Sequence, residues 1–231
     1  MFKNSRRIAV VLARSGSTRV PNKNMLEIGN KSLTLRAIEC ALENNIDVVL
    51  SSDSQEILDH IVHPDVHKHL RTERNSTAVS TSEDSVIEVI NSLGIPDDSD
   101  VMLLQPTSPF RTFKTIQRFL SIWDELDSAD FDSAFSAYAD HSEYWTESQI
   151  GLKRVSSILF PKEEAYRSQD RHPLYRETGA IYQTKARNLR DGNRFVNGRP
   201  YVFPCTFIES VDIDSQEDFK LAQAISLGIS D

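Results

Sequence analysis

The sequence predicts an α/β fold with a doubly wound, mostly parallel sheet. Short apolar, β-branched runs alternate with segments whose apolar residues recur at helical spacing, which is typical of parallel βαβ units. Polar residues follow several of the apolar runs directly, as they do where strand ends form one edge of a sheet. The 231 residues are enough for one large domain or one domain with an insertion.

The first half of the chain repeats a pattern of strands and helices. The strands are expected where short apolar runs occur, and the helices where apolar residues share one face. In the third helical segment, for example, Val86, Val89 and Ile90 fall on one side. The predicted elements, in chain order, are strand 8–13, helix 32–42, strand 47–50, helix 55–61, helix 84–93, strand 101–104 and helix 112–126.

The second half has fewer regular elements. A final helix is predicted at 216–227, and Ser215 can cap it together with Asp218. The predicted strands of this half are 132–137, 179–182 and 201–203.

A polar segment interrupts the pattern between residues 139 and 170. Its apolar residues, such as Trp145 and Phe160, are isolated from one another. We expect this segment to be an insertion beyond the sheet, serving as a dimerisation arm or a lid. The predicted organisation is one α/β domain formed by 1–138 and 171–231, with an inserted arm at 139–170.

Composition excludes several classes of protein. The net charge of −8 argues against a general nucleic-acid binder, which needs a basic surface. Nothing in the sequence approaches the roughly 20 apolar residues that span a bilayer. The apolar run Ile8–Ala13 is too short for a signal peptide, so we expect a cytoplasmic location. Cys40 and Cys205 belong to no CxxC pair or Cys/His cluster, which favours buried thiols over a zinc site.

A polar, basic loop, ARSGSTRVPNKN, follows the first strand at residues 13–24. The small residues Ser15 to Ser17 would let backbone N–H groups approach an anion, and Arg14 and Lys23 could neutralise a polyphosphate. The loop lacks the GK[ST] ending of a Walker A motif and is not GxGxxG. The alternative is a solvated turn whose charges face water.

A second polar segment, VDIDS, occupies residues 211–215. In an extended backbone, Asp212 and Asp214 point the same way, and two adjacent carboxylates repel unless a cation lies between them. Carboxylate oxygens suit Mg²⁺ that also contacts substrate phosphates. The alternative is an acidic cluster that stabilises the N-terminus of the following helix.

A third segment, YRSQDRHPLYRETG, carries Arg167, Arg171 and Arg176 in a protein that is acidic overall. Such a cluster suits an anionic partner, either a carboxylate or a phosphate. Pairing with Asp170 or Glu177 is the alternative. The histidines lack metal-ligand spacing and are interpreted as surface residues; they include His60, His63, His67, His69 and His141.

Four segments, three of them described above, resemble motifs of the acylneuraminate cytidylyltransferases, the CMP-sialic acid synthetases. The first loop is similar to the family's A-R-x-x-S-x-x-x-P-x-K-N pattern, and LLQPTSPFRT looks like its LQPTSPLRT segment. QDRHPLYRETGAIY resembles Q-D-x-x-P-x-Y-R-x-N-G-A-I-Y, and VDIDSQEDFKLAQ resembles D-I-D-T-x-x-D-x-x-x-A. The four matches occur in family order and span nearly the whole chain. The resemblance implies a nucleotide-diphospho-sugar-transferase-like fold and a homodimer formed through the inserted arm.

The resemblance also implies a reaction. The anomeric hydroxyl of a nonulosonic acid attacks the α-phosphate of CTP, which gives a CMP-sugar and pyrophosphate. Catalysis would come mainly from positioning and charge neutralisation. By the same resemblance, the first loop holds the CTP phosphates and cytidine through Arg14, Ser15, Ser17, Lys23 and Asn24.

The other implied site residues come from later segments. Arg74 and Ser85 correspond to nucleotide contacts, and Gln105 to a contact with the sugar acid. Arg176 would face the sugar carboxylate or a phosphate, and Arg167 is the remaining candidate for a catalytic arginine. Thr178 stands at a substrate-binding position, and Asp212 and Asp214 would hold Mg²⁺.

Three departures from the family pattern concern recognition of the sugar. The family's asparagine before Gly-Ala-Ile-Tyr is Thr178 here, and its second adjacent arginine is Ser168. The family's arm lysine has no counterpart between Asp140 and Ile150. The acceptor could therefore be a legionaminate-, pseudaminate- or other nonulosonate-type acid.

Two further hypotheses stay open. The first loop partly matches A-R-x-x-S-T-R-L-P-x-K, which is typical of the sister family that acts on 3-deoxy-manno-octulosonate. The departures at Thr178 and Ser168 are also compatible with a homologue that binds CTP without catalysis.

Overall fold

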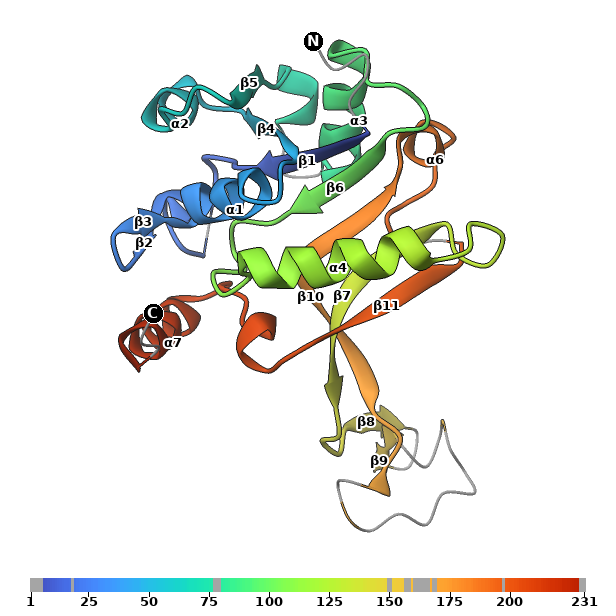
Figure 1. Ribbon diagram of the computed structural model, residues 1–231. Helices are drawn as coiled ribbons and strands as arrows, with labels where there is room; N and C mark the ends of the chain where they lie inside the picture. Colours follow the sequence, from blue (N-terminus) through green and yellow to red (C-terminus); the bar gives the residue numbers. More distant parts are fainter. Residues whose placement is uncertain are drawn as a thin grey trace.

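The central sheet of the protein is seen in a computed structural model that describes residues 6–17, 19–76, 80–148, 151–155, 159, 167, 170–196 and 198–228. Within these ranges the main sheet has seven strands in the order β11-β7-β10-β6-β1-β4-β5 (Figure 1). β10 pairs antiparallel with β6 and β7, and the other pairings in this sheet are parallel. The predicted mostly parallel sheet is therefore confirmed. The strands are β1 (Arg7–Leu12), β4 (Asp47–Ser52), β5 (Val66–Leu70), β6 (Asp100–Leu104), β7 (Ser133–Asp140), β10 (Leu174–Lys185) and β11 (Pro200–Cys205).

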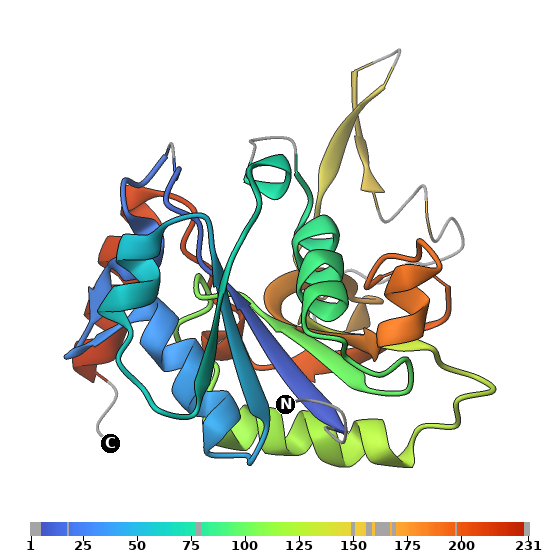
Figure 2. The ribbon, with the colours of Figure 1, turned by 90° about the horizontal axis from the view of Figure 1, so that it is seen from above.

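Helices cover both faces of this sheet, as a doubly wound fold requires (Figure 2). One face packs against α1, α2 and α4, and the opposite face against α3 and α6. α7 packs beside the β2–β3 hairpin in a smaller apolar cluster. The helices are α1 (Leu33–Leu42), α2 (Gln55–His60), α3 (Ser82–Ser92), α4 (Phe113–Glu125), α6 (Ala186–Arg190) and α7 (Gln216–Gly228), and the small strands are β2 (Glu27–Ile28) and β3 (Lys31–Ser32).

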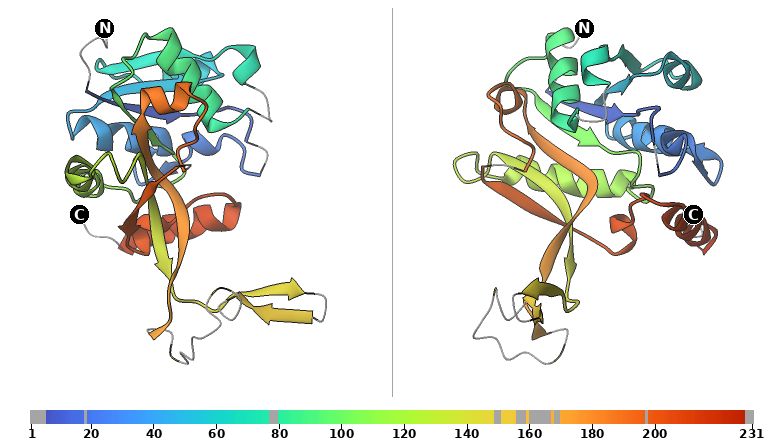
Figure 3. Two further views of the ribbon diagram at one scale, coloured as in Figure 1. Left: turned by 90° about the vertical axis from the view of Figure 1, so that its right-hand side faces the viewer. Right: turned by 180° about the vertical axis from the view of Figure 1, so that it is seen from behind.

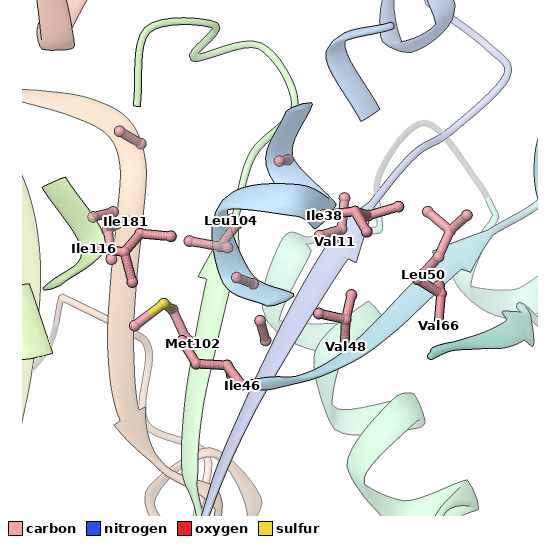
Figure 4. Close-up of a cluster of buried hydrophobic side chains, with 14 of the residues drawn as sticks. Val11, Ile38, Ile46, Val48, Leu50, Val66, Met102, Leu104, Ile116 and Ile181 are labelled. Atoms are coloured by element: carbon pink, nitrogen blue, oxygen red, sulfur yellow. The ribbon is translucent and has the colours of Figure 1, made fainter. Parts of the chain in front are cut away.

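The larger core lies between the sheet and the layer formed by α1, α2 and α4. Figure 4 shows Val11 and Leu104, at the ends of β1 and β6, packing toward Ile38 and Ile116 of α1 and α4. All four side chains are fully buried. Burial of one such side chain contributes about 1.5–3 kcal/mol, so this layer fixes the strand ends from which the polar loops emerge.

Side-chain caps determine where several helices begin. Thr81 and Asp84 form a reciprocal capping box at the start of α3. At α7, the Asp218 backbone N–H donates to the Ser215 hydroxyl and the Ser215 backbone N–H donates to the Asp218 carboxylate, at 3.2 and 2.8 Å. The predicted cap of the last helix is therefore confirmed.

The sequence pattern missed β5, whose sequence is VHKHL. This strand pairs only with β4 in the main sheet, and its polar residues hide the apolar alternation. One consequence is that the surface assignment of His69 is wrong, because this side chain is only 9% exposed.

The arm extends from the ends of β7 and β10. Both strands run further than predicted, to Asp140 and from Leu174, and a hairpin of β8 (Trp145–Ser148) and β9 (Gly151–Arg154) follows β7. Figure 3 shows this hairpin projecting away from the main sheet. Trp145 and Leu152 on it are 54% and 66% exposed.

No helix among the described residues is long and apolar enough to cross a membrane.

Candidate functional site

A polar pocket lies where the connections of the sheet diverge. From β1 the sheet continues through β4 on one side and through β6 on the other, and ligands of open α/β sheets bind at such a point, beyond the strand ends. The pocket has a volume of about 260 Å³. Its lining residues are Leu12, Arg14, Ser17, Lys23, Asn24, Arg71, Ser80, Thr81, Ser82, Ser85, Gln105, Pro106 and Thr107.

The loop after β1 is held in place by Asn24. This side chain is only 5% exposed, and its amide donates to the Arg14 carbonyl at 2.9 Å. The backbone carbonyl of Asn24 accepts from the Thr34 hydroxyl at 2.7 Å. Arg14, Ser17 and Lys23 remain at the pocket wall. The buried amide therefore fixes the loop, and the cations and hydroxyl of the loop face the cavity.

Ser15 makes a different contact from its neighbours. Its backbone N–H and its hydroxyl donate to the two Asp53 oxygens at 2.8 and 3.1 Å. Asp53 follows directly after β4, so this pair ties the first loop to the next strand end. Ser15 is not among the residues that line the pocket.

Arg71, rather than Arg74, lines this pocket. Arg71 donates to the hydroxyl and the carbonyl of Ser51 at 3.1 and 2.8 Å, and burial lowers the pKa of its guanidinium. Arg74 lies in the short 3₁₀ segment η2 (Glu73–Asn75) and is exposed. Arg71 is the first residue after β5, so recognition of that strand in the sequence would have identified it.

A small hydrogen-bond network holds the segment around Arg71. The Ser51 hydroxyl also lies 3.2 Å from Nδ1 of His69, and burial lowers the pKa of this imidazole. Glu88 of α3 accepts from the Thr72 backbone N–H at 2.7 Å. These contacts connect β4, β5 and α3 behind the pocket.

The N-terminal turn of α3 forms another wall. Thr81, Ser82 and Ser85 line the pocket together with Ser80, and Ser85 is 3% exposed. The N-terminus of an α-helix carries partial positive charge and free backbone N–H groups, which favour an anion or a polar base edge.

Gln105, at the end of β6, separates this pocket from a second one of about 320 Å³. The second pocket is lined by Ser82, Glu83, Leu103, Gln105, Glu177, Tyr182, Arg194, Phe195 and Val196. Because Gln105 and Ser82 belong to both linings, the two pockets adjoin.

A distortion in β10 brings its backbone close to Gln105. The register with β7 shifts between Glu177 and Tyr182, where five residue steps along β10 match two along β7. Within this bulge, Gly179 has φ +71°, and a Cβ there would lie 2.9 Å from Oε1 of Gln105. Only glycine combines this backbone with such a close approach.

Arg111 fixes the same region from inside the protein. Its guanidinium donates to the carbonyls of Gln105 and Ala180 at 3.2 and 2.6 Å, which joins the loop after β6 to the bulge of β10. The side chain is 4% exposed, and burial lowers its pKa to about 10. The guanidinium stays charged at neutral pH and positions the backbone of Gln105.

Thr178 points into the sheet. It is 2% exposed, its hydroxyl lies 2.6 Å from the Ser136 hydroxyl, and it accepts from the Ala180 backbone N–H at 3.3 Å. The hydroxyl is therefore part of the packing between β7 and β10.

The predicted arginines of the third segment lie outside both pocket linings. Arg176 donates to the Ser210 hydroxyl at 3.1 Å, and its guanidinium lies 5.9 Å from the centre of the Tyr138 ring. Arg167 is exposed, and its carbonyl accepts from the Asp170 backbone N–H.

The two aspartates of VDIDS differ in their surroundings. The Ile213 backbone N–H donates to the Thr107 carbonyl at 2.9 Å, which brings this segment against the loop after β6. Burial raises the pKa of Asp212, and its buried Oδ1 has no hydrogen-bond partner among the described residues. Asp214 accepts from Lys23 at 2.9 Å and lies 3.7 Å from Arg19.

These oxygens fit a hard cation. An unpartnered buried carboxylate oxygen gains most from a positive ion, and Mg²⁺ prefers such ligands. Asp214, though not Asp212, lines a small cavity of about 90 Å³ together with Arg14, Ser17, Arg19, Val20 and Lys23. In the described part of the chain, no three His, Cys, Asp or Glu side chains form a metal-binding group, so substrate oxygens would have to complete the ligand set.

Comparison with known proteins gives a consistent result. A family model described as cytidylyltransferase matches residues 8–228. CMP-N,N'-diacetyllegionaminic acid synthase of Legionella pneumophila is 30% identical over 226 residues, which cover 94% of this chain and 95% of that protein. N-acylneuraminate cytidylyltransferase of Streptococcus agalactiae is 27% identical over 92% of this chain, and the chain spans about half (51%) of its length.

Solved structures share the fold at low sequence identity. CMP:2-keto-3-deoxy-manno-octonic acid synthetase in complex with CTP matches with a TM-score of 0.69 and 16% identity, over 97% of this chain and 99% of that one. A 4-diphosphocytidyl-2C-methyl-D-erythritol synthase from Anaerococcus prevotii matches with a TM-score of 0.63 and 12% identity, over 96% of each chain. The family model spans nearly the whole sequence and the legionaminic acid synthase aligns along its length, so this chain belongs to the cytidylyltransferase family.

Proposed function

We propose that this protein transfers CMP from CTP to a nonulosonic acid and releases pyrophosphate. The observation that carries the proposal is the pair of adjoining pockets at the sheet edge, which share Gln105 and Ser82. One pocket has a cationic loop suited to a triphosphate, and the other has mixed polar and apolar walls suited to a sugar acid. The names of the legionaminic acid and N-acylneuraminate relatives support the same class of acceptor.

The first pocket suits CTP. Arg14 and Lys23 would neutralise the phosphates, and Ser17 would donate to a phosphate oxygen. The hydroxyls at the start of α3 and the Arg71 guanidinium would contact the nucleoside. Asn24 acts indirectly, because its amide already holds the Arg14 carbonyl.

Transfer then depends on orientation. The anomeric hydroxyl of the acid would attack the α-phosphorus and lose its proton to solvent. The bond between the α-phosphorus and the oxygen that bridges to the β-phosphorus would break, and pyrophosphate would leave. Gln105 lies between the two pockets and would orient the acceptor beside that phosphate. Lys23 would leave Asp214 for the phosphates as their negative charge arrives.

Asp212 and Asp214 would hold Mg²⁺, supported by the unpartnered Asp212 oxygen. When bound, Mg²⁺ would neutralise phosphate charge and polarise a phosphoryl oxygen. Arg176 and Arg167 would serve the acceptor carboxylate only after a change in their surroundings, because neither lines the pockets.

The test is pyrophosphate release from CTP with Mg²⁺ on a panel of acids. The panel is N-acetylneuraminate, N,N'-diacetyllegionaminate, pseudaminate and 3-deoxy-manno-octulosonate. Turnover with a nine-carbon acid supports the proposal, and turnover only with 3-deoxy-manno-octulosonate replaces it. Asp212→Asn should abolish turnover, while calorimetry in the absence of a metal ion should still detect binding of CTP to this variant. Binding of CTP without turnover on any acid would favour a non-catalytic homologue.

A homodimer is part of the same proposal. The exposed Trp145 and Leu152 support it, because the pairing of β8 with β9 places both on one face of the hairpin, and grouped apolar surface gains stability by burial against a second chain. Light scattering of the protein and of a Trp145→Ser, Leu152→Ser variant tests it. A monomeric wild-type protein at micromolar concentration would overturn it.

A further inference from the structure

The second pocket has a wall that is unusual for a site that takes an acid. It contains the carboxylates of Glu83 and Glu177 and one guanidinium, that of Arg194. Two like charges in one pocket repel an incoming carboxylate or phosphate. The acceptor's own carboxylate would therefore face the cationic first pocket, and some other part of the acceptor would meet this wall.

Glu177 has a defined orientation. Tyr182 donates its hydroxyl to Oε2 of Glu177 at 3.0 Å. Burial, followed by the nearby Glu177 charge, raises the pKa of Tyr182, so the phenol stays protonated and remains a donor at neutral pH. Oε1 of Glu177 has no hydrogen bond recorded within the described ranges, so it can accept from a ligand.

Apolar side chains lie next to these carboxylates. Phe195 is 2% exposed, and its ring centre lies 6.0 Å from that of Tyr182. Leu103 and Val196 complete this part of the lining. The pocket thus combines hydrogen-bond acceptors with a compact apolar surface, and a nitrogen substituent with a short alkyl or acyl part matches both features.

We propose that Glu177, assisted by Glu83, determines acceptor specificity by accepting a hydrogen bond from an N–H group on the nonulosonic acid. The N–H belongs to an acylamino or an amino substituent, and the carbon part of an acylamino group packs on Tyr182 and Val196, which are partly exposed. An acceptor with hydroxyl groups alone lacks the carbon part that would hold its donor group against Glu177. This inference rests on the proposed function and adds the chemistry by which the acceptor is selected.

The test compares Glu177→Gln and Glu177→Leu with the wild-type protein. Glu177 is exposed, so both variants should fold, and thermal melting checks this. Glu56→Gln on α2 is a matched control, because Glu56 is also exposed and lines neither pocket. The acceptors are N-acetylneuraminate, N,N'-diacetyllegionaminate and 3-deoxy-manno-octulosonate, the last of which carries hydroxyl groups without nitrogen.

Glu177→Leu should lower kcat/KM for the acylamino acids by about tenfold or more, with the KM for CTP unchanged, since a hydrogen bond to a charged group is lost. The preference over 3-deoxy-manno-octulosonate should fall by the same factor. Glu177→Gln should retain most activity if the donor is an acylamino N–H, and should lose it if the donor is an ammonium group, which needs the full charge.

An unchanged preference in Glu177→Leu, with wild-type turnover intact, overturns this inference alone. Absence of wild-type turnover on every acid overturns the proposed function instead. In that case, calorimetry of the same acids on the CTP-bound protein decides the inference. Binding that Glu177→Leu weakens supports it, and binding that Glu177→Leu leaves unchanged, or no binding of any acid, refutes it.

Discussion

Substitution of Gly179 by alanine should change both the geometry of the pocket and the stability of the fold, and the two changes can be measured separately. Gly179 has φ +71°, and a Cβ there would lie 2.9 Å from Oε1 of Gln105. That distance is shorter than carbon and oxygen normally approach, so something has to move. The Gln105 side chain is flexible and its backbone is held by Arg111, so we expect its amide to swing away from the shared wall of the two pockets.

The expected loss of stability and the expected loss of catalytic efficiency in Gly179→Ala can be worked out separately. A left-handed backbone costs a non-glycine residue about 1–2 kcal/mol, which lowers Tm by roughly 2–8 °C in a chain of this length. Loss of one neutral hydrogen bond from Gln105 to substrate costs about 0.5–1.5 kcal/mol, or roughly 2- to 12-fold in kcat/KM. Stability should therefore fall moderately, and catalytic efficiency toward the acceptor should fall several-fold.

Gly94→Ala is the matched control. Gly94 has φ +61°, no atom lies within 4 Å of the expected Cβ, and the residue follows the end of α3 that is remote from the pocket. Thermal melting should show a similar loss of stability in both variants. Steady-state kinetics with varied acceptor should show reduced kcat/KM in Gly179→Ala alone. Equal activities in the two variants would refute the role given to this close approach.

Three further predictions concern single residues. The pKa of Glu209 is lowered, because burial, which raises it, is outweighed by hydrogen bonds from Thr115, Thr206 and Arg118. The contribution of Glu209 to the free energy of unfolding should be complete above its ordinary pKa of 4.5 and should disappear as the pH falls through the lower pKa of the folded state. Urea unfolding of Glu209→Gln should show a free energy of unfolding about 1–3 kcal/mol lower than that of the wild type at pH 7, and this free energy should depend less on pH in the acid range. Arg71→Met should weaken CTP binding in calorimetry by about tenfold or more and Arg74→Met by less than about twofold, whereas equal losses would contradict the assignment from the pocket lining. Thr178→Ala should reduce the free energy of unfolding by about 1–2 kcal/mol through loss of the contact with Ser136, with little change in acceptor KM; the reverse pattern would return Thr178 to the acceptor site.

The regular part of the fold could be predicted because its short apolar runs indicate strands and its apolar residues at helical spacing indicate helices. Strands β1 and β6 are continuous apolar runs, and the face of α3 repeats at helical spacing. The edge strand β5 could not be recognised, because VHKHL pairs on one side only and mixes cations with apolar residues. The expected contact Arg74 came from the resemblance to the family, and Arg71, the first residue after β5, lines the pocket instead.

The grouping of several first-loop residues with Gln105 could be predicted, because each of them belongs to a loop next to a strand end. Arg14, Ser17, Lys23 and Gln105 meet at one pocket, as the order of strand ends indicates. Sequence pattern could not show that Ser15 binds Asp53 or that Thr178 points into the sheet, because both depend on partners that tertiary structure supplies. It also missed the second pocket, since Glu83, Glu177 and Arg194 come from three distant segments.

The contact between Lys23 and Asp214 has a consequence for synthesis of the protein. The two residues are 191 positions apart, and the bond joins the first loop to the segment before the last helix. On the ribosome, the first loop emerges long before its partner, so a nascent chain carries Lys23 before Asp214 has been synthesised. Long-range closure of this kind is slow, because the intervening chain must be ordered first. A chain that terminates between residues 206 and 211 therefore retains all seven strands of the main sheet but lacks Asp212, Asp214 and α7.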